Sequence, residues 1–365
     1  MKKIIKTFNE TDHNYVFSPV SVYHALAILA QTTNAETKQE ILDAIGVSED
    51  ELINCVKELN NQLNINAGKG KLSMNSSLWL SDSLNTNDET IEKISKNNNC
   101  VIKKVPMGTK EANKEVQHWV NENTNNLLKD SVESIETGID TLFQLYSTIY
   151  LKGNWDIEFD AKDTKKDVFH KSINEDIKCD FMNQCIRTDM YEGKRFKAIA
   201  LYIRGIARAT FILPNDGLSP SDIANDEDLL NLLEGDTKGL DSKEYIVNLS
   251  LPKFDVTFDG DILEKLSKLG IQKATVMGEA DFSPISNEKN LYLNKAKQAA
   301  RLKIDEDGVE ASAFTMLDAI CAGIILTTPE EIDFKLDRPF MFSLNKSIKN
   351  KTVPLFVGTV VDPRG

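Results

Sequence analysis

The spacing of apolar residues predicts several helices in the first part of this chain. Residues 21–29 and 36–45 repeat apolar side chains at the interval of three to four that places them on one helical face. Ser21 is placed to cap the first of these helices, and Gly46 to end the second. Later in the chain a third set has the same spacing: Ile262, Leu263, Leu266 and Leu269.

Strand patterns dominate the second half. Side chains alternate between apolar and polar over residues 245–251, and near-continuous apolar runs cover residues 207–213 and 353–361. Helices come mainly from the first half and strands from the second, so the elements do not alternate as they do in a parallel sheet. The sequence therefore predicts an α+β domain rather than a doubly wound sheet.

A separate alternation lies between residues 309 and 319. Small or apolar side chains occupy one parity: Val309, Ala311, Ala313, Thr315, Leu317 and Ala319. The other parity carries both charges: Glu310, Ser312, Phe314, Met316 and Asp318. Three acids and Gly308 precede this run and Cys321-Ala-Gly323 follows it, which indicates a solvated hinge and an exposed loop. The period of two is that of a strand with one buried face, so the segment looks like a loop that can become a strand; taken alone, it also fits a helical turn or an ordinary buried strand.

Composition narrows the class of protein without identifying it. The chain has 365 residues, no linker and no repeat, which favours a single domain over residues 1–365. Its 56 acidic and 43 basic residues give a formal net charge of −13, which disfavours nucleic acid and anionic membranes as partners. The N-terminus lacks the apolar core of a signal peptide, and the absence of an apolar run near eighteen residues predicts a soluble chain.

Motifs for enzyme, metal and cofactor chemistry were not found. The sequence has no nucleophile elbow, no zinc-protease helix and no dinucleotide glycine fingerprint. The segment Gly68-Lys-Gly-Lys71 fails the spacing of a phosphate loop and is interpreted as a turn. The four histidines are scattered, and the five cysteines have no metal-ligand spacing, so free thiols are expected. We therefore predict no catalytic residues, no metal and no cofactor.

Several segments together resemble the serpin family, and they occur in its order and approximate spacing. They are Phe17-Ser-Pro-Val-Ser21, Trp119-Val-Asn-Glu-Asn-Thr124, Ile149-Tyr-Leu-Lys-Gly-Asn-Trp155, Leu251-Pro-Lys-Phe254, Ala280-Asp-Phe-Ser283, Phe334-Lys-Leu-Asp-Arg-Pro-Phe-Met-Phe-Ser-Leu344 and Phe356-Val-Gly-Thr-Val-Val-Asp-Pro363. The resemblance implies three β-sheets surrounded by about eight or nine helices, with a reactive-centre loop over approximately residues 306–333. It also implies a conformational change in which the cleaved loop enters the central sheet.

The resemblance assigns roles along that loop. The hinge would comprise Glu306, Asp307, Gly308, Val309, Glu310, Ala311, Ser312, Ala313, Phe314 and Thr315. Gly308 gives the hinge backbone freedom, and Val309 is expected to be the first side chain buried on insertion. Residues 309–320 would span roughly 40 Å at about 3.3 Å per residue. Their ladder bonds, at about 1 kcal/mol net each, would sum to the order of 10 kcal/mol.

The position of the reactive bond follows from the hinge. If Gly308 is the fifteenth residue before the bond, as in the family, the bond joins Ala322 and Gly323, flanked by Ile320, Cys321 and Ile324. A small residue before the bond favours elastase-like or subtilisin-like serine proteases. The arm over residues 323–333 is longer than usual, so cleavage anywhere within 319–325 stays open. So does an aspartate-cleaving protease that would read Asp318.

A second set of residues is implied to act as a latch under the central sheet. In the family a hydrogen-bonded cluster holds strands closed at this place. Ser18 and Ser21 match the pattern, whereas Ser147 replaces the usual asparagine and Gln298 the usual histidine. Both substitutes can donate and accept hydrogen bonds, so the cluster can persist.

The resemblance implies that the chain is a suicide-substrate inhibitor of serine proteases. It would act as a monomer and would not be an enzyme. The alternative is a non-inhibitory member that acts as a carrier, chaperone or storage protein. A heparin-like cofactor is not expected, because residues 48–58, where a basic helix would be needed, are acidic. The family role favours an extracellular location, with an intracellular one open because no signal peptide is present. The source organism, a bacterial one included, is also open.

Overall fold

The computed structural model describes residues 1–365 except 68–69, 140, 310–328 and 350. The described residues form ten α-helices, four of them with seven residues or fewer. The helices are α1 (Lys2–Phe8), α2 (Pro19–Thr32), α3 (Ala35–Ile45), α4 (Glu49–Gln62), α5 (Asp88–Asn98), α6 (Lys110–Asn123), α7 (Lys129–Val132), α8 (Pro220–Ile223), α9 (Glu227–Glu234) and α10 (Leu263–Lys268). Short 3₁₀ turns lie at Ala161–Asp163 and Lys273–Thr275.

Sixteen strands account for most of the rest of the described chain. They are β1 (Tyr15–Phe17), β2 (Ile65–Ala67), β3 (Gly70–Ser81), β4 (Cys100–Val105), β5 (Phe143–Asn154), β6 (Lys165–Ser172), β7 (Glu175–Glu192), β8 (Phe196–Ile203), β9 (Ala207–Pro214), β10 (Asp241–Pro252), β11 (Phe254–Asp261), β12 (Lys297–Ile304), β13 (Gly308–Val309), β14 (Glu331–Lys335), β15 (Phe340–Ile348) and β16 (Lys351–Val360). The predicted strands over 207–213, 245–251 and 353–361 are thus confirmed as β9, β10 and β16.

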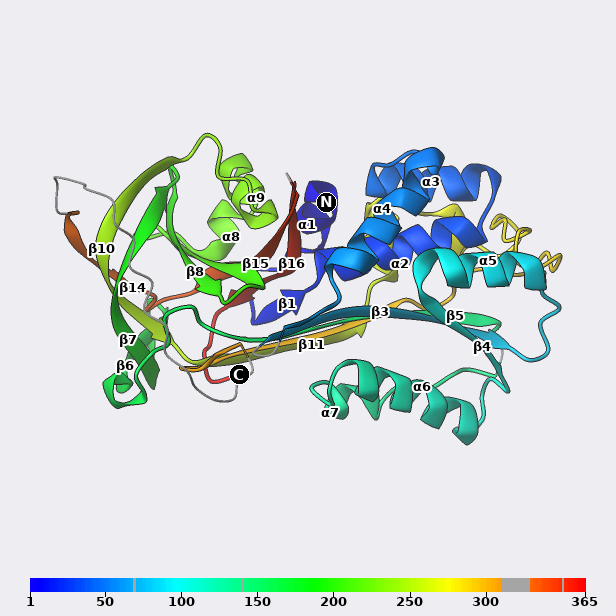
Figure 1. Cartoon of the computed structure of the whole chain (residues 1–365), viewed down its shortest axis with the longest axis horizontal. Helices are drawn as coiled ribbons and strands as arrows, with labels where there is room; N and C mark the ends of the chain where they lie inside the picture. The colour runs from blue at the N-terminus through cyan, green and yellow to red at the C-terminus, as the bar shows by residue number, and fades with distance from the viewer. Residues whose placement is uncertain (68–69, 140, 310–328, 350) are drawn as a thin grey trace.

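Two hydrogen-bonded sheets organise these strands. The seven-stranded sheet has the order β11-β12-β13-β5-β3-β2, with β4 paired to β3. The nine-stranded sheet has the order β1-β16-β15-β9-β8-β7-β10-β14, with β6 paired to β7. Figure 1 shows α2, α3, α4 and α5 over one face of the seven-stranded sheet and α6 and α7 over the other. The α+β class is confirmed.

The expected three sheets are joined into two by one long strand. β7 has 18 residues. It pairs with β6 up to Phe181, with β10 from Phe181 to Glu192, and with β8 on its other edge from Met190. Hydrogen bonding therefore runs without a break from one expected sheet into the next, and the two are described as a single nine-stranded network.

Helix α2 lies at the centre of the fold. Twelve of its fourteen residues are buried, so it contacts other elements on nearly all sides. Its N-cap is Ser18, whose side chain accepts a hydrogen bond from the backbone N–H of Ser21, and Pro19 occupies the first turn. The sequence prediction that Ser21 caps this helix is therefore wrong. Gly46 does end α3, in the left-handed conformation with φ of 70°.

The hydrophobic core is continuous along the chain. One cluster of buried side chains extends from Ile4 in α1 to Val360 in β16 and includes Phe17, Trp155 and Phe342. A smaller cluster packs α6 and α7 against Trp79 of β3. None of the helices that the structure describes combines the length and apolar character needed to cross a bilayer.

Candidate functional site

A tight turn connects β12 to β13 and forms the described part of the predicted hinge. The backbone N–H of Asp305 donates to the carbonyl of Gly308 at 3.1 Å, and the N–H of Gly308 donates to the carbonyl of Asp305 at 3.2 Å. Gly308 has φ of +146°, and a Cβ there would lie 2.2 Å from the Gly153 carbonyl oxygen. Only glycine fits this position.

Trp155, directly after β5, holds this turn in place. Its indole Nε1 donates to the carbonyl of Asp305 at 3.0 Å, and its backbone N–H donates to the carbonyl of Asp307 at 3.1 Å. The backbone N–H of Phe159 donates to the carbonyl of Glu306 at 3.2 Å. Three consecutive carbonyls of the turn are therefore bonded to one neighbouring segment, and the turn is fixed against the sheet.

The acids of the hinge are less solvated than their sequence indicates. The Glu306 carboxylate accepts a hydrogen bond from Thr164 Oγ1 at 2.8 Å and pairs with Lys253 Nζ at 2.8 Å. Its side chain is 15% exposed. Burial alone would raise the pKa of Glu306, but hydrogen bonds from Lys253 and Thr164 outweigh it and hold the pKa below its usual range. The expected solvated hinge is thus corrected for Glu306, because distant residues bind its charge, whereas Asp307 is exposed.

Val309 lies in the seven-stranded sheet, the one that the cleaved loop is predicted to enter. As part of β13 it pairs with Gly153 of β5 on one side and with Ile304 of β12 on the other. Its exposed fraction is 2%. Val309 is thus buried at the point where the predicted insertion would begin, and its role during insertion stays a prediction.

The remaining loop predictions lie outside the described residues. The hinge residues concerned are Glu310, Ala311, Ser312, Ala313, Phe314 and Thr315. The reactive bond Ala322–Gly323 and its flanking residues Ile320, Cys321 and Ile324 are also outside. Their roles stay predictions.

The four predicted latch residues come together where α2 meets the seven-stranded sheet. Ser21 Oγ donates to the carbonyl of Ser147 in β5 at 3.2 Å, and Gln298 Nε2 in β12 donates to the carbonyl of Ser18 at 3.1 Å. The helix therefore bonds to strands on both sides of β13. These bonds reach backbone carbonyls, while Ser147 Oγ and Gln298 Oε1 are buried and have no hydrogen-bond partner among the described groups.

Sequence reasoning missed a further contact of the same helix. His24 Nδ1 lies 2.8 Å from Ser76 Oγ in β3, and both residues are buried. Ser76 is the register partner of Ser147. The only sequence signal was that Ser21 and His24 are three residues apart and so share a helical face; nothing in the sequence placed Ser76 opposite that face.

Among the described residues, a strand fills the seam between β5 and β12 at one end, where β13 lies. In the described part of the chain both strands pair with the two residues of β13 rather than with each other. Beyond β13, a cavity of about 50 Å³ is lined by Ser21, Leu145, Ser147, Lys297 and Gln298. A second, of about 40 Å³, lies toward α6 and α7. In the described part of the chain, no further strand pairs with β5 or β12 along this seam.

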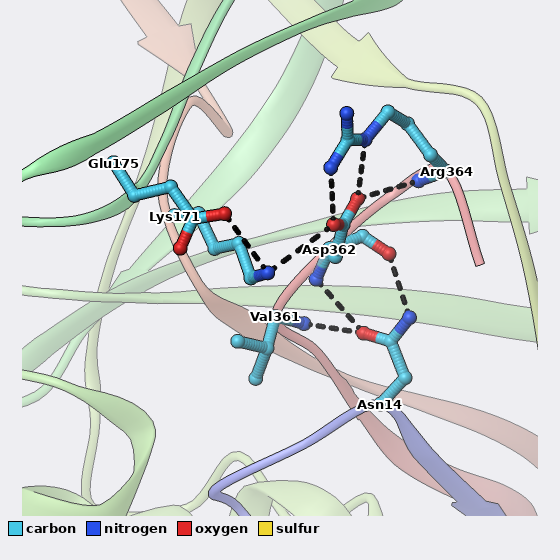
Figure 2. A network of polar contacts seen from close by, with 6 residues as sticks. All are labelled: Asn14, Lys171, Glu175, Val361, Asp362 and Arg364. Carbon is cyan, nitrogen blue, oxygen red and sulfur yellow. Dashed lines mark hydrogen bonds and ion pairs between the residues drawn. The ribbon is translucent and has the colours of Figure 1, made fainter.

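Polar contacts fix the C-terminal segment that follows β16 (Figure 2). The side chain of Asn14 accepts from the backbone N–H groups of Val361 at 2.7 Å and Asp362 at 2.9 Å, and it donates to the Asp362 carbonyl at 2.6 Å. The Asp362 carboxylate binds Arg364 Nη2 at 2.7 Å and lies 3.5 Å from Lys171 Nζ. Hydrogen bonds from Arg364 lower the pKa of Asp362 to about 2, although burial acts in the opposite direction.

Asp362→Asn should therefore destabilise the protein in a pH-dependent way. A carboxyl whose pKa is lower in the folded state stabilises the fold above its unfolded pKa of about 4, here by about 2 kcal/mol. This stabilisation is lost as the pH falls from 4 toward 2. Urea unfolding of Asp362→Asn and wild type should differ at pH 7 and converge at low pH. A variant of an exposed acid, Asp189→Asn, serves as control, and a pH-independent difference would contradict the assignment.

Metal ligands do not gather in the described ranges: no three His, Cys, Asp or Glu side chains lie together as they would around an ion. The predictions of no metal and no cofactor stay predictions.

Known proteins match this chain, in sequence and in structure, over nearly its whole length. The family model described as "Serpin (serine protease inhibitor)" matches residues 2–363. An alpha-1-antiproteinase of Callosciurus caniceps is 31% identical, covering 96% of this chain and 83% of its own length. Two solved structures share the fold. A thermophilic serpin, Tengpin, in its native state has a TM-score of 0.83 and 24% identity, covering 99% of this chain and 92% of its own. Human thyroxine-binding globulin in complex with thyroxine has a TM-score of 0.82 and 22% identity, covering 97% of this chain and 93% of its own.

Proposed function

This chain belongs to the serpin family, and from that premise we propose that it is a suicide-substrate inhibitor of serine proteases. After cleavage of the loop, the freed segment would continue β13 down the seam between β5 and β12. The protease would stay attached as an acyl-enzyme. The observation that carries this proposal is the position of Val309, paired to both strands that border the seam.

The sequence after Val309 supports the same direction of insertion. Side chains of a strand alternate between its faces, so a continuation of β13 would place Ala311, Ala313 and Thr315 on the buried parity. These residues are small enough to enter between formed strands without a clash. The turn at residues 305–308 is already closed, so insertion needs an extension of β13 rather than a new reversal of the chain.

The target class is inferred from the predicted bond. Ala322 before the bond suits an elastase-like or subtilisin-like protease with a small apolar pocket. Incubation with pancreatic elastase should give an SDS-stable complex and release a fragment whose mass corresponds to residues 323–365. A fragment that begins elsewhere within 320–326 would move the bond and keep the mechanism. Complete turnover without any stable complex, by elastase and subtilisin alike, would contradict the proposed function.

A carrier role is the second candidate, and one cavity favours it. A hollow of about 470 Å³, within the range of small-molecule pockets, lies between α2, α4 and the β15–β16 hairpin. Its lining includes Tyr23, Val47, Cys55, Leu59, Ile348 and Val353. Such a carrier would bind an apolar ligand without cleavage and would keep its thermal stability when the loop is cut.

The remaining assignments rest on the family and on charge. We infer a monomer in an extracellular location, with no nucleic acid or membrane partner. We infer no heparin-like cofactor, because α4 begins with Glu49, Asp50 and Glu51. The alpha-1-antiproteinase relative comes from Callosciurus caniceps and gives no support to a bacterial source.

A further inference from the structure

One face of α2 is bonded to two neighbouring strands of the seven-stranded sheet. Ser21 Oγ donates to the Ser147 carbonyl of β5, and His24 Nδ1 lies 2.8 Å from Ser76 Oγ of β3. Ser76 and Ser147 are directly opposite each other in the β3–β5 register. We call these four residues the polar bridge. On the other side of the seam, Gln298 of β12 bonds to the Ser18 carbonyl at the start of the same helix.

Widening of the seam must break part of this arrangement. A strand that is fully inserted along the seam holds β5 and β12 two strand spacings apart, about 9.6 Å, along their whole length. Helix α2 is bonded to both sides, through the polar bridge and through Gln298. The strand pair β3–β5 and the strand β12 cannot move apart while both sets of bonds to one rigid helix persist, so the polar bridge opposes insertion.

The surroundings of His24 favour its neutral form. The residue is 1% exposed, and its Nε2 is buried without a hydrogen-bond partner among the described groups. The side chains that interact with it are uncharged: Ser76 of β3 and Asn60 of α4. Next to Ser76 in the sheet lies its register partner in β4, Cys100. Burial raises the pKa of the Cys100 thiol to about 12.

Charged groups on the elements around α2 do not compensate a charge on the ring. Among the residues that the structure describes, no Lys, Arg, Asp or Glu is buried, so those of α1, α3, α4, α5, β5 and β16 lie at or near the surface. Burial lowers the pKa of His24 to about 4, and a hydrogen bond with Asn60 acts in the opposite direction. A protonated ring would carry a second N–H donor on Nε2, an atom for which the described residues provide no hydrogen-bond partner in this structure.

We propose that His24 is a positioning residue for loop insertion, whose neutral imidazole holds the β3–β5 strand pair against α2 and whose protonation releases it. This inference rests on the proposed insertion mechanism. Once the strands have moved, the ring is free of Ser76 and can meet water, so acid favours the opened sheet. If the ring then titrates at its ordinary value of 6.5 rather than about 4, the opened form gains up to about 30-fold in relative population between pH 8 and pH 5.

The test uses a reaction that needs no protease. A synthetic peptide with the sequence of residues 310–320 is incubated with the intact protein, and its incorporation into the sheet is followed by native gel and by melting temperature. Wild type should incorporate the peptide up to about 30-fold faster at pH 5 than at pH 8. His24→Gln, which keeps a donor and an acceptor for Ser76, should change less than threefold. His118→Gln, at an exposed position of α6, should behave as wild type.

Two further measurements keep the outcome decisive. Ser76→Ala removes the strand-side partner and should bring the rate at pH 8 close to the acid rate of wild type. A wild-type rate that is flat between pH 5 and pH 8 would overturn the inference without any variant, as would equal pH dependence in wild type and His24→Gln. If elastase complexes form while the pH dependence is absent, only this inference fails; if no protease is ever trapped, the proposed function fails.

Discussion

Val309→Arg is expected to convert this chain from an inhibitor of elastase into its substrate. In a fully inserted strand residue 309 lies between β5 and β12 and cannot leave, so the guanidinium would be buried without a partner at a cost of several kcal/mol. Because about 1.4 kcal/mol changes a ratio tenfold, the number of inhibitor molecules consumed per trapped protease should rise at least tenfold. The readout is the fraction of SDS-stable complex against cleaved chain.

The intact protein should tolerate the same change better. The structure describes β13 over Gly308 and Val309, and an arginine that withdraws from it in the uncleaved protein loses one valine's burial, about 2 kcal/mol. Glu310→Arg is the matched control, since the alternation of the sequence assigns residue 310 to the opposite parity. Efficient trapping by Val309→Arg, equal to that by wild type and Glu310→Arg, would rule out insertion along this seam.

Cleavage of the loop by a protease that is not trapped is expected to raise the melting temperature. Insertion of residues 309–320 would add ladder bonds worth on the order of 10 kcal/mol. An unfolding entropy of about 2.1 cal/mol/K per residue converts this into a rise of roughly 13 °C for a chain of this length. Calorimetry before and after limited proteolysis measures the change directly.

The same measurement separates the two candidate functions. Retention of the original melting temperature in the cleaved form would favour the carrier role, because the loop would then have been cut without entering the sheet. The cleaved Val309→Arg variant provides an internal comparison, since it should show a smaller rise than cleaved wild type.

The part of the hinge that sequence predicted correctly depended on local pattern. Gly308 could be assigned because a residue without Cβ was needed at a sharp reversal, and the structure places backbone atoms of β5 against it. The solvation of Glu306 could not be predicted, because its partners Thr164 and Lys253 are 142 and 53 residues away in the chain. Three consecutive acidic residues indicate a solvated segment only when no cation from a distant part of the chain pairs with them.

The residues at the latch also divide into those that the sequence could identify and one that it could not. Resemblance placed Ser18, Ser21, Ser147 and Gln298 in one cluster, and the structure brings them together. It could not find His24, because a histidine on an apolar helix is informative only once the strand opposite it is known. The wrong assignment of the cap to Ser21 could have been avoided from the local sequence. Proline favours the first turn of a helix, so Pro19 indicates a helix that begins there, with Ser18 as its cap.

The place of β15 and β16 in the nine-stranded sheet has a consequence for how this protein is made. β16 lies between β1, near the start of the chain, and β15, which in turn covers β9. When synthesis has reached the end of β14, β1 therefore has no partner strand in this sheet, and the edge of β9 is open to other chains. Folding must wait for the last segment to be synthesised, and crowded nascent chains should be most prone to aggregate in that interval.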